Sequence, residues 1–359
     1  MPRSDILLHR LHNQGILGKG FSAPNEMVGQ LGAVQGQDYL ITKWAFGLRI
    51  PGSKQEDVDN AMENGTILRT HIMRPTWHFV TPKDIRWIQM LTAPRVRQAM
   101  AFYNRQQKLG PQVYTKSNVL IEKELKGGNA LTRKELGSIL KKAGIPSTNL
   151  QVSFLLMGAE LDALVCSGPL KGKQFTYMLV DDRAPKAKTL TKEESLMELA
   201  SRYFTSHGPA TLSDFTWWSG LTVAEAKQGI EKSKLRKEEY GEQTYWFGKN
   251  TPVNPVPLTA HLLPTYDEYV IGYKSSRSLF SPTRPFDMMA QIPFFNCLMI
   301  DGHVAGMWRR VLKSKHIELH IRLSVSLESD EKEAVEKAIE AYSTFHGLPV
   351  QTSYGKSTT

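Results

Sequence analysis

The chain has 359 residues, of which 41% are hydrophobic and 22% are charged, a composition typical of a folded globular protein. It contains no run of eighteen apolar residues, and residues 1–15 lack the apolar core of a signal peptide, so we expect no membrane span and a cytoplasmic location. The two cysteines, Cys166 and Cys297, are far apart in sequence, which excludes a disulfide framework and a zinc site built on cysteines.

Positive charge is concentrated in one part of the chain. The formal net charge is +10, and residues 81–145 contain thirteen Lys and Arg against four Asp and Glu. Such an excess attracts a polyanion such as DNA, because binding releases condensed counterions. A solvated basic face without a partner would have the same composition, so charge alone leaves both interpretations open.

Residues 1–115 predict a first winged-helix-like unit in a loose form. Apolar spacing indicates helices over residues 6–16, 25–35, 40–50 and 58–65. The run over residues 67–80 is β-branched and aromatic, and Pro75 interrupts any long strand ladder within it.

Residues 116–185 and 186–250 predict two further copies of one unit. Each copy reads as three helices followed by a two-stranded wing, which is the order of a winged helix-turn-helix. The helices are expected over 118–128, 132–144 and 152–168 in the first copy, and over 194–208, 211–220 and 222–234 in the second. Thr132 followed by Glu135 has the spacing of a capping box, and strands on either side of Gly241 form the second wing.

Residues 251–359 predict a β-rich C-terminal unit. Four prolines lie between Pro252 and Pro264, and the alternating run over 316–327 indicates a strand before a closing helix over 329–347. The expected fold class is therefore α+β, with three tandem winged-helix units and a β-rich C-terminal unit.

Gln35, Gly36 and Gln37 form the most unusual segment of the chain. On a helix the two glutamines would point to nearly opposite sides, so they can share a site only where the backbone leaves the helix, which Gly36 permits. Their amides can hold a water or a base edge but cannot take a proton. Two surface glutamines at a helical turn would give the same pattern, and Asp38 is expected to cap the helix that begins at Tyr39.

Basic side chains after this segment are the candidates for contact with DNA. Arg69 and His71 alternate onto one face of the predicted strand, and Trp77 could support an unstacked base or belong to the core. The predicted DNA-binding residues are Arg69, His71, Arg74, His78, Lys83, Arg86, Arg95, Arg97, Arg133 and Lys134. His71 and His78 lack a set of carboxylate or cysteine partners, so no metal site is expected.

Two further phrases are interpreted as structural. The acidic pair in Tyr266-Asp267-Glu268-Tyr269 has no third partner in sequence, and we expect it to position Arg277 or a neighbouring loop. Trp217 and Trp218 on a predicted helix are expected to be core residues rather than a wedge for DNA.

Four phrases in this order resemble the AlkZ-type family of winged-helix DNA glycosylases: LGAVQGQDYLITKWAFGLRI, RTHIMRPTWHFVTPKDIRWI, LLPTYDEYVIGYKSSR and DGHVAGMWRR. The resemblance implies three tandem winged helices with a β-rich C-terminal part. It also implies a Gln–hydrophobic–Gln motif in which both glutamines contact the catalytic water. Gln35 and Gln37 match that motif, whereas Gly36 departs from its hydrophobic middle position. Gln37 resembles the AlkZ-like branch rather than the YcaQ-like branch, which has Asp there, and Arg74 and His78 match a recurring motif of the family.

The chemistry that this resemblance implies is consistent with two amides. An N7- or N3-alkylated purine is a cation that leaves as a neutral base, so a site need only position water and stabilise developing charge. No lysine nucleophile and no cofactor are required, so the reaction would stop at an abasic site in double-stranded DNA.

Three readings therefore stand beside one another. The first is a monomeric, monofunctional DNA glycosylase acting on cationic alkylpurines, including bulky adducts or interstrand crosslinks. The second is a non-catalytic winged-helix regulator or architectural protein, which accounts for the repeats and the charge equally well. The third is a family member that has lost activity. The sequence leaves open whether the base is flipped and which helices contact DNA.

Overall fold

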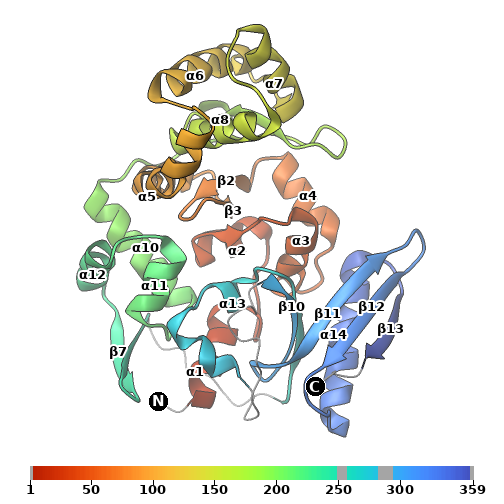
Figure 1. Ribbon diagram of the computed structural model, residues 1–359. Coiled ribbons are helices and arrows are strands. Elements are labelled where there is room, and N and C mark those ends of the chain that lie inside the picture. Colours follow the sequence, from red (N-terminus) through yellow and green to blue (C-terminus); the bar gives the residue numbers. More distant parts are fainter. Residues whose placement is uncertain (1–2, 249–256, 282–293, 356–359) are drawn as a thin grey trace.

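The computed structural model describes residues 3–248, 257–281 and 294–355 of the chain, and its fold is of the predicted α+β class (Figure 1). After helix α1 (Arg3–Asn13), one order of elements occurs three times: helix, strand, two helices and two strands. In the last occurrence a single bridge takes the place of the first strand. We call the three segments the first repeat (24–80), the second repeat (111–179) and the third repeat (192–247).

The first repeat places the glutamine segment between a strand and a helix. Its elements are α2 (Pro24–Leu31), β1 (Val34–Gln35), α3 (Tyr39–Gly47), α4 (Gln55–Glu63), β2 (Leu68–Ile72) and β3 (Thr76–Val80). The strands form a sheet of order β1-β3-β2, in which Gln35 is paired with His78. As predicted, Asp38 caps α3, because its carboxylate accepts a hydrogen bond from the amide of Ile41 at 3.4 Å.

A long helix, α5 (Ile85–Gln106), leads into the second repeat. Sequence analysis did not predict α5, since Pro94 lies in its interior and proline is disfavoured there. The second repeat contains α6 (Pro111–Leu125), β4 (Leu131–Thr132), α7 (Arg133–Lys142), α8 (Asn149–Leu161), β5 (Val165–Ser167) and β6 (Thr176–Leu179). The predicted capping box is present, with Thr132 and Glu135 bonded to each other's backbone amides at 3.2 and 2.7 Å.

The third repeat follows the short helix α9 (Val180–Arg183). It contains α10 (Lys192–Ser206), α11 (Leu212–Ser219), α12 (Val223–Lys232), β7 (Arg236–Tyr240) and β8 (Gln243–Phe247). The predicted hairpin around Gly241 is confirmed, and a bridge between Ala210 and Trp246 completes the unit.

The C-terminal unit is built on a five-stranded sheet of order β13-β12-β11-β10-β9. Its elements are β9 (Ala260–Leu263), α13 (Glu268–Ile271), the 3₁₀ helix η1 (Ser275–Phe280), β10 (Asn296–Ile300), β11 (His303–Leu312), β12 (Ile317–Leu323), α14 (Ser329–His346) and β13 (Val350–Gly355). Two of the four prolines expected at its start, Pro252 and Pro255, lie outside the described residues.

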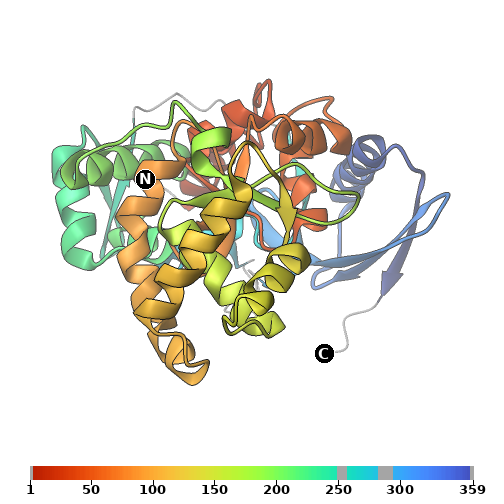
Figure 2. The same ribbon diagram turned by 90° about the horizontal axis from the view of Figure 1, so that it is seen from above.

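The other two repeats and the C-terminal unit surround the first repeat. In Figures 1 and 2 the third repeat and the C-terminal sheet lie on opposite sides of it, and the second repeat covers a third side. One apolar core joins α1, the first and third repeats and α13, whereas a second joins the first repeat to the C-terminal sheet and α14. Within the described residues no helix is both long and apolar enough to cross a membrane.

A buried ion pair connects the first repeat to the C-terminal unit. Both Arg49, after α3, and Asp267, before α13, have side chains that are 0% exposed, and two parallel hydrogen bonds of 2.7 and 2.8 Å join them. Arg49 also donates to Gln14 and to the carbonyl of Ala45. Loss of one member would leave the other charge buried without a partner, which is far more costly than loss of a surface pair.

We therefore expect Asp267→Asn to lower the free energy of unfolding by about 3–5 kcal/mol. Glu193→Gln is the matched control, because it breaks the exposed pair of Glu193 with Lys232 and is expected to cost less than about 1 kcal/mol. Urea unfolding followed by circular dichroism measures both variants. Equal, small losses in the two variants would contradict the role given to the buried pair.

Candidate active site

The backbone between Gln35 and Gln37 is not helical, and sharing of one site by the two side chains requires this. β1 ends at Gln35, α3 begins at Tyr39, and the amide of Gly36 donates to the carbonyl of Trp77 at 2.8 Å. Gly36 belongs to no helix or strand, and the chain bends at Gln37 and Asp38. Gln35 is 3% exposed, while Gln37 is half-buried, so the segment reaches the surface at Gln37.

The space beside Gly36 explains the missing hydrophobic residue of the motif. A Cβ atom added at Gly36 would lie 2.8 Å from a ring carbon of Phe79, and Phe79 is fully buried. The Phe79 ring occupies the volume that a side chain at position 36 would need. A hydrophobic side chain at position 36 would therefore require the Phe79 ring to move.

Gln35 is held at both ends by charged groups. Its backbone amide donates to Oε1 of Glu268 at 2.7 Å, and its side-chain oxygen accepts from Nη2 of Arg74 at 2.7 Å. Arg74 also donates to the carbonyls of Trp217 and Trp218 at the end of α11, each at 3.2 Å. Burial lowers the pKa of Arg74 to about 10, so the guanidinium remains charged at neutral pH.

Gln37 is held by the neighbouring strand and by Arg69. The side-chain oxygen of Gln37 accepts from the amide of Trp77 at 3.2 Å. Arg69 donates from Nε to the carbonyl of Gly36 at 2.9 Å and from Nη2 to that of Gln37 at 3.4 Å. Because Arg74 and the Trp77 amide are donors only, both carboxamide oxygens are assigned by their partners.

Glu268 is the site residue that sequence analysis missed. Its side chain is 1% exposed, and Oε2 accepts from Nε1 of Trp218 at 2.8 Å and lies 3.3 Å from Nε2 of His207. Burial raises the pKa of the Glu268 carboxyl, but hydrogen bonds from His207 and from the amide of Gln35 outweigh burial and hold that pKa below its ordinary value. The signal in the sequence was an acidic pair, Asp267 and Glu268, inside an apolar, aromatic phrase. In the structure Asp267 binds Arg49, and Glu268 faces Gln35.

The structure places three of the predicted DNA-binding residues inside the protein. Arg69 is 6% exposed, and His71 is 3% exposed and bonded to the carboxylate of Glu160. His78 is 0% exposed, and its Nδ1 lies 3.0 Å from the carbonyl of Thr76. These three side chains are buried in the protein interior, so they are not accessible to a DNA phosphate.

The other predicted DNA-binding residues are spread over several faces. Arg86 and Arg97 are eleven residues apart, on one side of α5, and bind Asp181 and Asp162. Arg95 on the opposite side donates to the carbonyl of Gly220 at 3.3 Å. The exposed members of the set are Lys83, Arg95, Arg133 and Lys134. Trp218 is fully buried, as predicted, and Trp217 is half-buried beneath Arg74 and Lys274.

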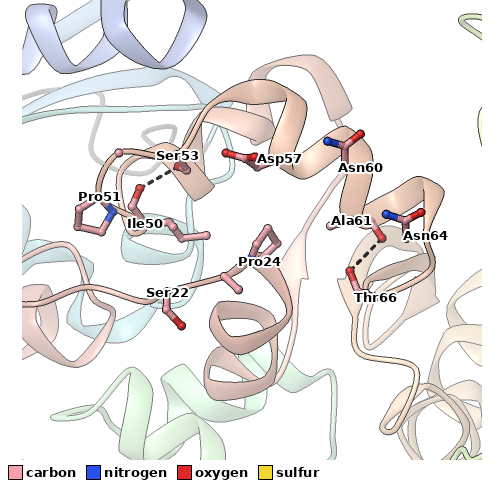
Figure 3. Close-up of a pocket in the computed structure, with 12 residues that line it drawn as sticks. Ser22, Pro24, Ile50, Pro51, Ser53, Asp57, Asn60, Ala61, Asn64 and Thr66 are labelled. Carbon is pink, nitrogen blue, oxygen red and sulfur yellow. Dashed lines mark hydrogen bonds between the residues drawn. The ribbon is translucent and has the colours of Figure 1, made fainter.

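A polar cavity of about 450 Å³ lies between α2 and α4, away from the glutamine segment (Figure 3). Its Ser53 and Thr66 hydroxyls already donate to the carbonyls of Ile50 and Ala61. The carboxylate of Asp57, which also lines the cavity, accepts from the amide of Lys54 at 2.7 Å. Among the residues that the structure describes, no cluster of three His, Cys, Asp or Glu side chains could hold a metal ion.

His78 makes the stability of the site dependent on pH. Burial and the charge of Arg74 lower the pKa of His78 to about 3, and its Nε2 has no hydrogen-bond partner among the described residues. The unfolded chain binds a proton at about pH 6.5 and the folded chain does not. The contribution of neutral His78 is thus complete above pH 6.5 and is lost as the pH falls from there toward 3.

We expect His78→Asn to reduce the loss of unfolding free energy between pH 7 and pH 5 by about 2 kcal/mol relative to the unsubstituted chain. Asparagine can still donate to the carbonyl of Thr76 but does not titrate. Urea unfolding at several pH values gives the two slopes. Identical slopes would show that His78 binds a proton in the folded protein.

The chain resembles known DNA glycosylases over nearly its whole length. Residues 28–345 match the protein family described as DNA glycosylase AlkZ-like. Over 341 residues the chain is 24% identical to an interstrand DNA cross-link repair glycosylase of Streptomyces sahachiroi. The aligned region covers 85% of this chain and 87% of that relative. The fold is similar to the solved structure of Streptomyces sahachiroi DNA glycosylase AlkZ, with a TM-score of 0.78 at 19% identity, over 98% of this chain and 99% of that one. The family match includes Gln35, Gln37 and Glu268, and the chain belongs to the AlkZ-like family of DNA glycosylases.

Proposed function

We propose that this glycosylase hydrolyses the N-glycosidic bond of cationic N7- or N3-alkylated purines in double-stranded DNA, with Gln35 and Gln37 positioning the water. The observation that carries the proposal is the fixed orientation of both carboxamides, each of which is bound through its oxygen. Membership of a glycosylase family supports an enzyme over a non-catalytic regulator. The proposal extends to bulky adducts and interstrand crosslinks, because the Streptomyces sahachiroi relative is named for crosslink repair.

The two carboxamides suit the binding of a water molecule. Each side-chain oxygen accepts one hydrogen bond from the protein and retains a second lone pair for a water proton. The amide nitrogens of Gln35 and Gln37 have no hydrogen bond within the described part of the chain, so they can donate to water or to the substrate. Half-buried Gln37 gives the water a route to DNA at the surface.

The reaction needs little activation of the leaving group. As the bond between C1′ and the purine nitrogen breaks, its electron pair neutralises the cationic purine and the sugar becomes oxocarbenium-like. The water oxygen bonds to C1′, and its surplus proton passes to solvent. Positioning of the water and stabilisation of charge are then the tasks left to the protein, and the product is an abasic site.

Glu268 supplies negative charge without acting as a base. Oε2 is occupied by Trp218 and His207, Oε1 accepts from the amide of Gln35, and the pKa of the carboxyl lies below its ordinary value, so Glu268 is a weak base for a water proton. The buried carboxylate offsets the charge of Arg74, and a carboxylate close to the reacting sugar stabilises positive charge as it develops.

The three repeats have the element order of winged helices, and we propose that they are tandem winged-helix units. Their third helices, α4, α8 and α12, carry no net positive charge: α4 has four acidic residues and no basic one, and α8 has no Lys or Arg. Third helices of this kind are unsuited to phosphate contact. We therefore propose that a monomer in the cytoplasm contacts DNA mainly through exposed cations outside them, including Lys83, Arg95, Arg133 and Lys134.

We expect Gln37→Ala to reduce release of N7-methylguanine from a duplex at least tenfold, with the Kd for DNA unchanged, because the water loses one of its two amide partners. Gln30→Ala is the matched control, since Gln30 is an exposed glutamine on the adjacent helix α2. Single-turnover base release and fluorescence anisotropy measure the rate and the affinity.

Three substrates extend this test: N7-methylguanine, a bulky N7 adduct and an N7-linked crosslink. Absence of release from all three by the unsubstituted chain would overturn the proposed substrate class and would favour an inactive family member. Release with strand cleavage would contradict a monofunctional reaction.

We also expect Glu268→Gln to lower the single-turnover rate at least tenfold in protein that is still folded at the assay temperature, with a lower melting temperature because the buried charge of Arg74 loses its counter-charge. Glutamine keeps an oxygen for the amide of Gln35 but removes the negative charge. Glu198→Gln, at a partly exposed position on α10, is the control for loss of a carboxylate. A rate within twofold of the unsubstituted chain would limit Glu268 to a packing role.

A further inference from the structure

Arg69 is a buried cation with no carboxylate in direct contact, and the charge of Glu160 acts on it only through space. It is 6% exposed, and no ion pair of Arg69 occurs within the described residues. A buried guanidinium ordinarily requires a carboxylate, because removal of its charge from water is costly. The donors of Arg69 are directed instead to the carbonyls of Gly36 and Gln37, the two residues at the centre of the glutamine segment.

Two aromatic rings take the place of a carboxylate beside Arg69. The guanidinium carbon lies 4.4 Å from the ring centroid of Trp77 and 4.5 Å from that of Phe175. Rings at this distance attract a desolvated cation through their quadrupoles. Trp77 belongs to the first repeat, whereas Phe175 precedes β6 of the second repeat, so one of the two supports comes from a different unit.

Phe175 also contacts the far end of the glutamine segment. Its ring meets that of Tyr39 edge-on at 5.2 Å, and Tyr39 is the first residue of α3. Phe175 thus supports residues 36–39 at two points, through Arg69 at the carbonyls and through Tyr39 at the helix. Leu170, in the same hairpin, packs on the same core, and its amide donates to Glu63 at 3.1 Å. Leu170 therefore joins the hairpin to the first repeat at α4, away from Arg69.

We propose that Phe175 and Arg69 are positioning residues for Gln37, so that the second repeat sets the geometry of the catalytic segment in the first. This inference rests on the proposed role of Gln37. The side chain of Arg69 binds the carbonyls on both sides of Gln37, those of Gly36 and of Gln37 itself. A displacement of about 1 Å at a reacting group can cost on the order of a hundredfold in rate. Lysine cannot replace Arg69, because a single ammonium lacks the fork that reaches two carbonyls.

The test compares Phe175→Ala, Phe175→Tyr and Leu170→Ala in the full chain. We expect Phe175→Ala to lower single-turnover release of N7-methylguanine at least tenfold at saturating DNA, with the Kd within twofold. Phe175→Tyr retains the ring and is expected to keep the rate within twofold. Leu170→Ala loosens the same hairpin without touching Arg69 and is expected to keep the rate as well.

Hydrogen exchange of residues 35–38 gives a readout that is independent of activity. We expect faster exchange there in Phe175→Ala and unchanged exchange in Leu170→Ala, because only the former removes support from Arg69. A Phe175→Ala rate within twofold of the unsubstituted chain would overturn the inference, as would equal losses of rate in Phe175→Ala and Leu170→Ala. If the unsubstituted chain releases no base, the proposed function fails. The hydrogen-exchange comparison then decides by itself whether Phe175 holds residues 36–38 in place.

Discussion

The buried pair of Arg49 and Asp267 determines how the glutamine segment of the first repeat meets Glu268 of the C-terminal unit. Arg49 follows α3 of the first repeat and Asp267 precedes α13, so their bidentate contact fixes one backbone against the other in the interior. Glu268 is the next residue, and its carboxylate therefore reaches the amide of Gln35. A charged pair in this place has a directional geometry that apolar packing between the same segments would lack.

The site combines opposite charges around an uncharged pair of amides. Arg74 binds the side chain of Gln35 while Glu268 binds its backbone, so the cation and the anion hold one residue from two directions. His78, directly opposite Gln35 in the sheet, remains neutral in its buried position. These groups can stabilise developing charge and orient a water molecule. Hydrolysis requires no more than this when the damaged base leaves as a neutral molecule.

Residues from all four units hold the glutamine segment in place. Trp217 and Trp218 of the third repeat accept hydrogen bonds from Arg74, Phe175 of the second repeat lies against Arg69, and Glu268 belongs to the C-terminal unit. The first repeat carries both glutamines but holds them only with the help of the other three parts. The two larger apolar cores likewise run across the repeats.

Local patterns in the sequence determined the elements and the candidate pair. Capping residues such as Thr132 and Asp38, apolar periodicity and turn glycines such as Gly241 act over a few residues, so they predicted most helices and hairpins and the departure from the helix at Gly36. Helix α5 was not predicted, because Pro94 opposes it locally and packing compensates, both against the second repeat and in the core shared with the first and third repeats. The partners of Gln35 and Gln37 were decided by tertiary structure alone. Glu268 is 233 residues from Gln35, and Phe175 is more than a hundred from Arg69, so no local pattern relates the members of either pair.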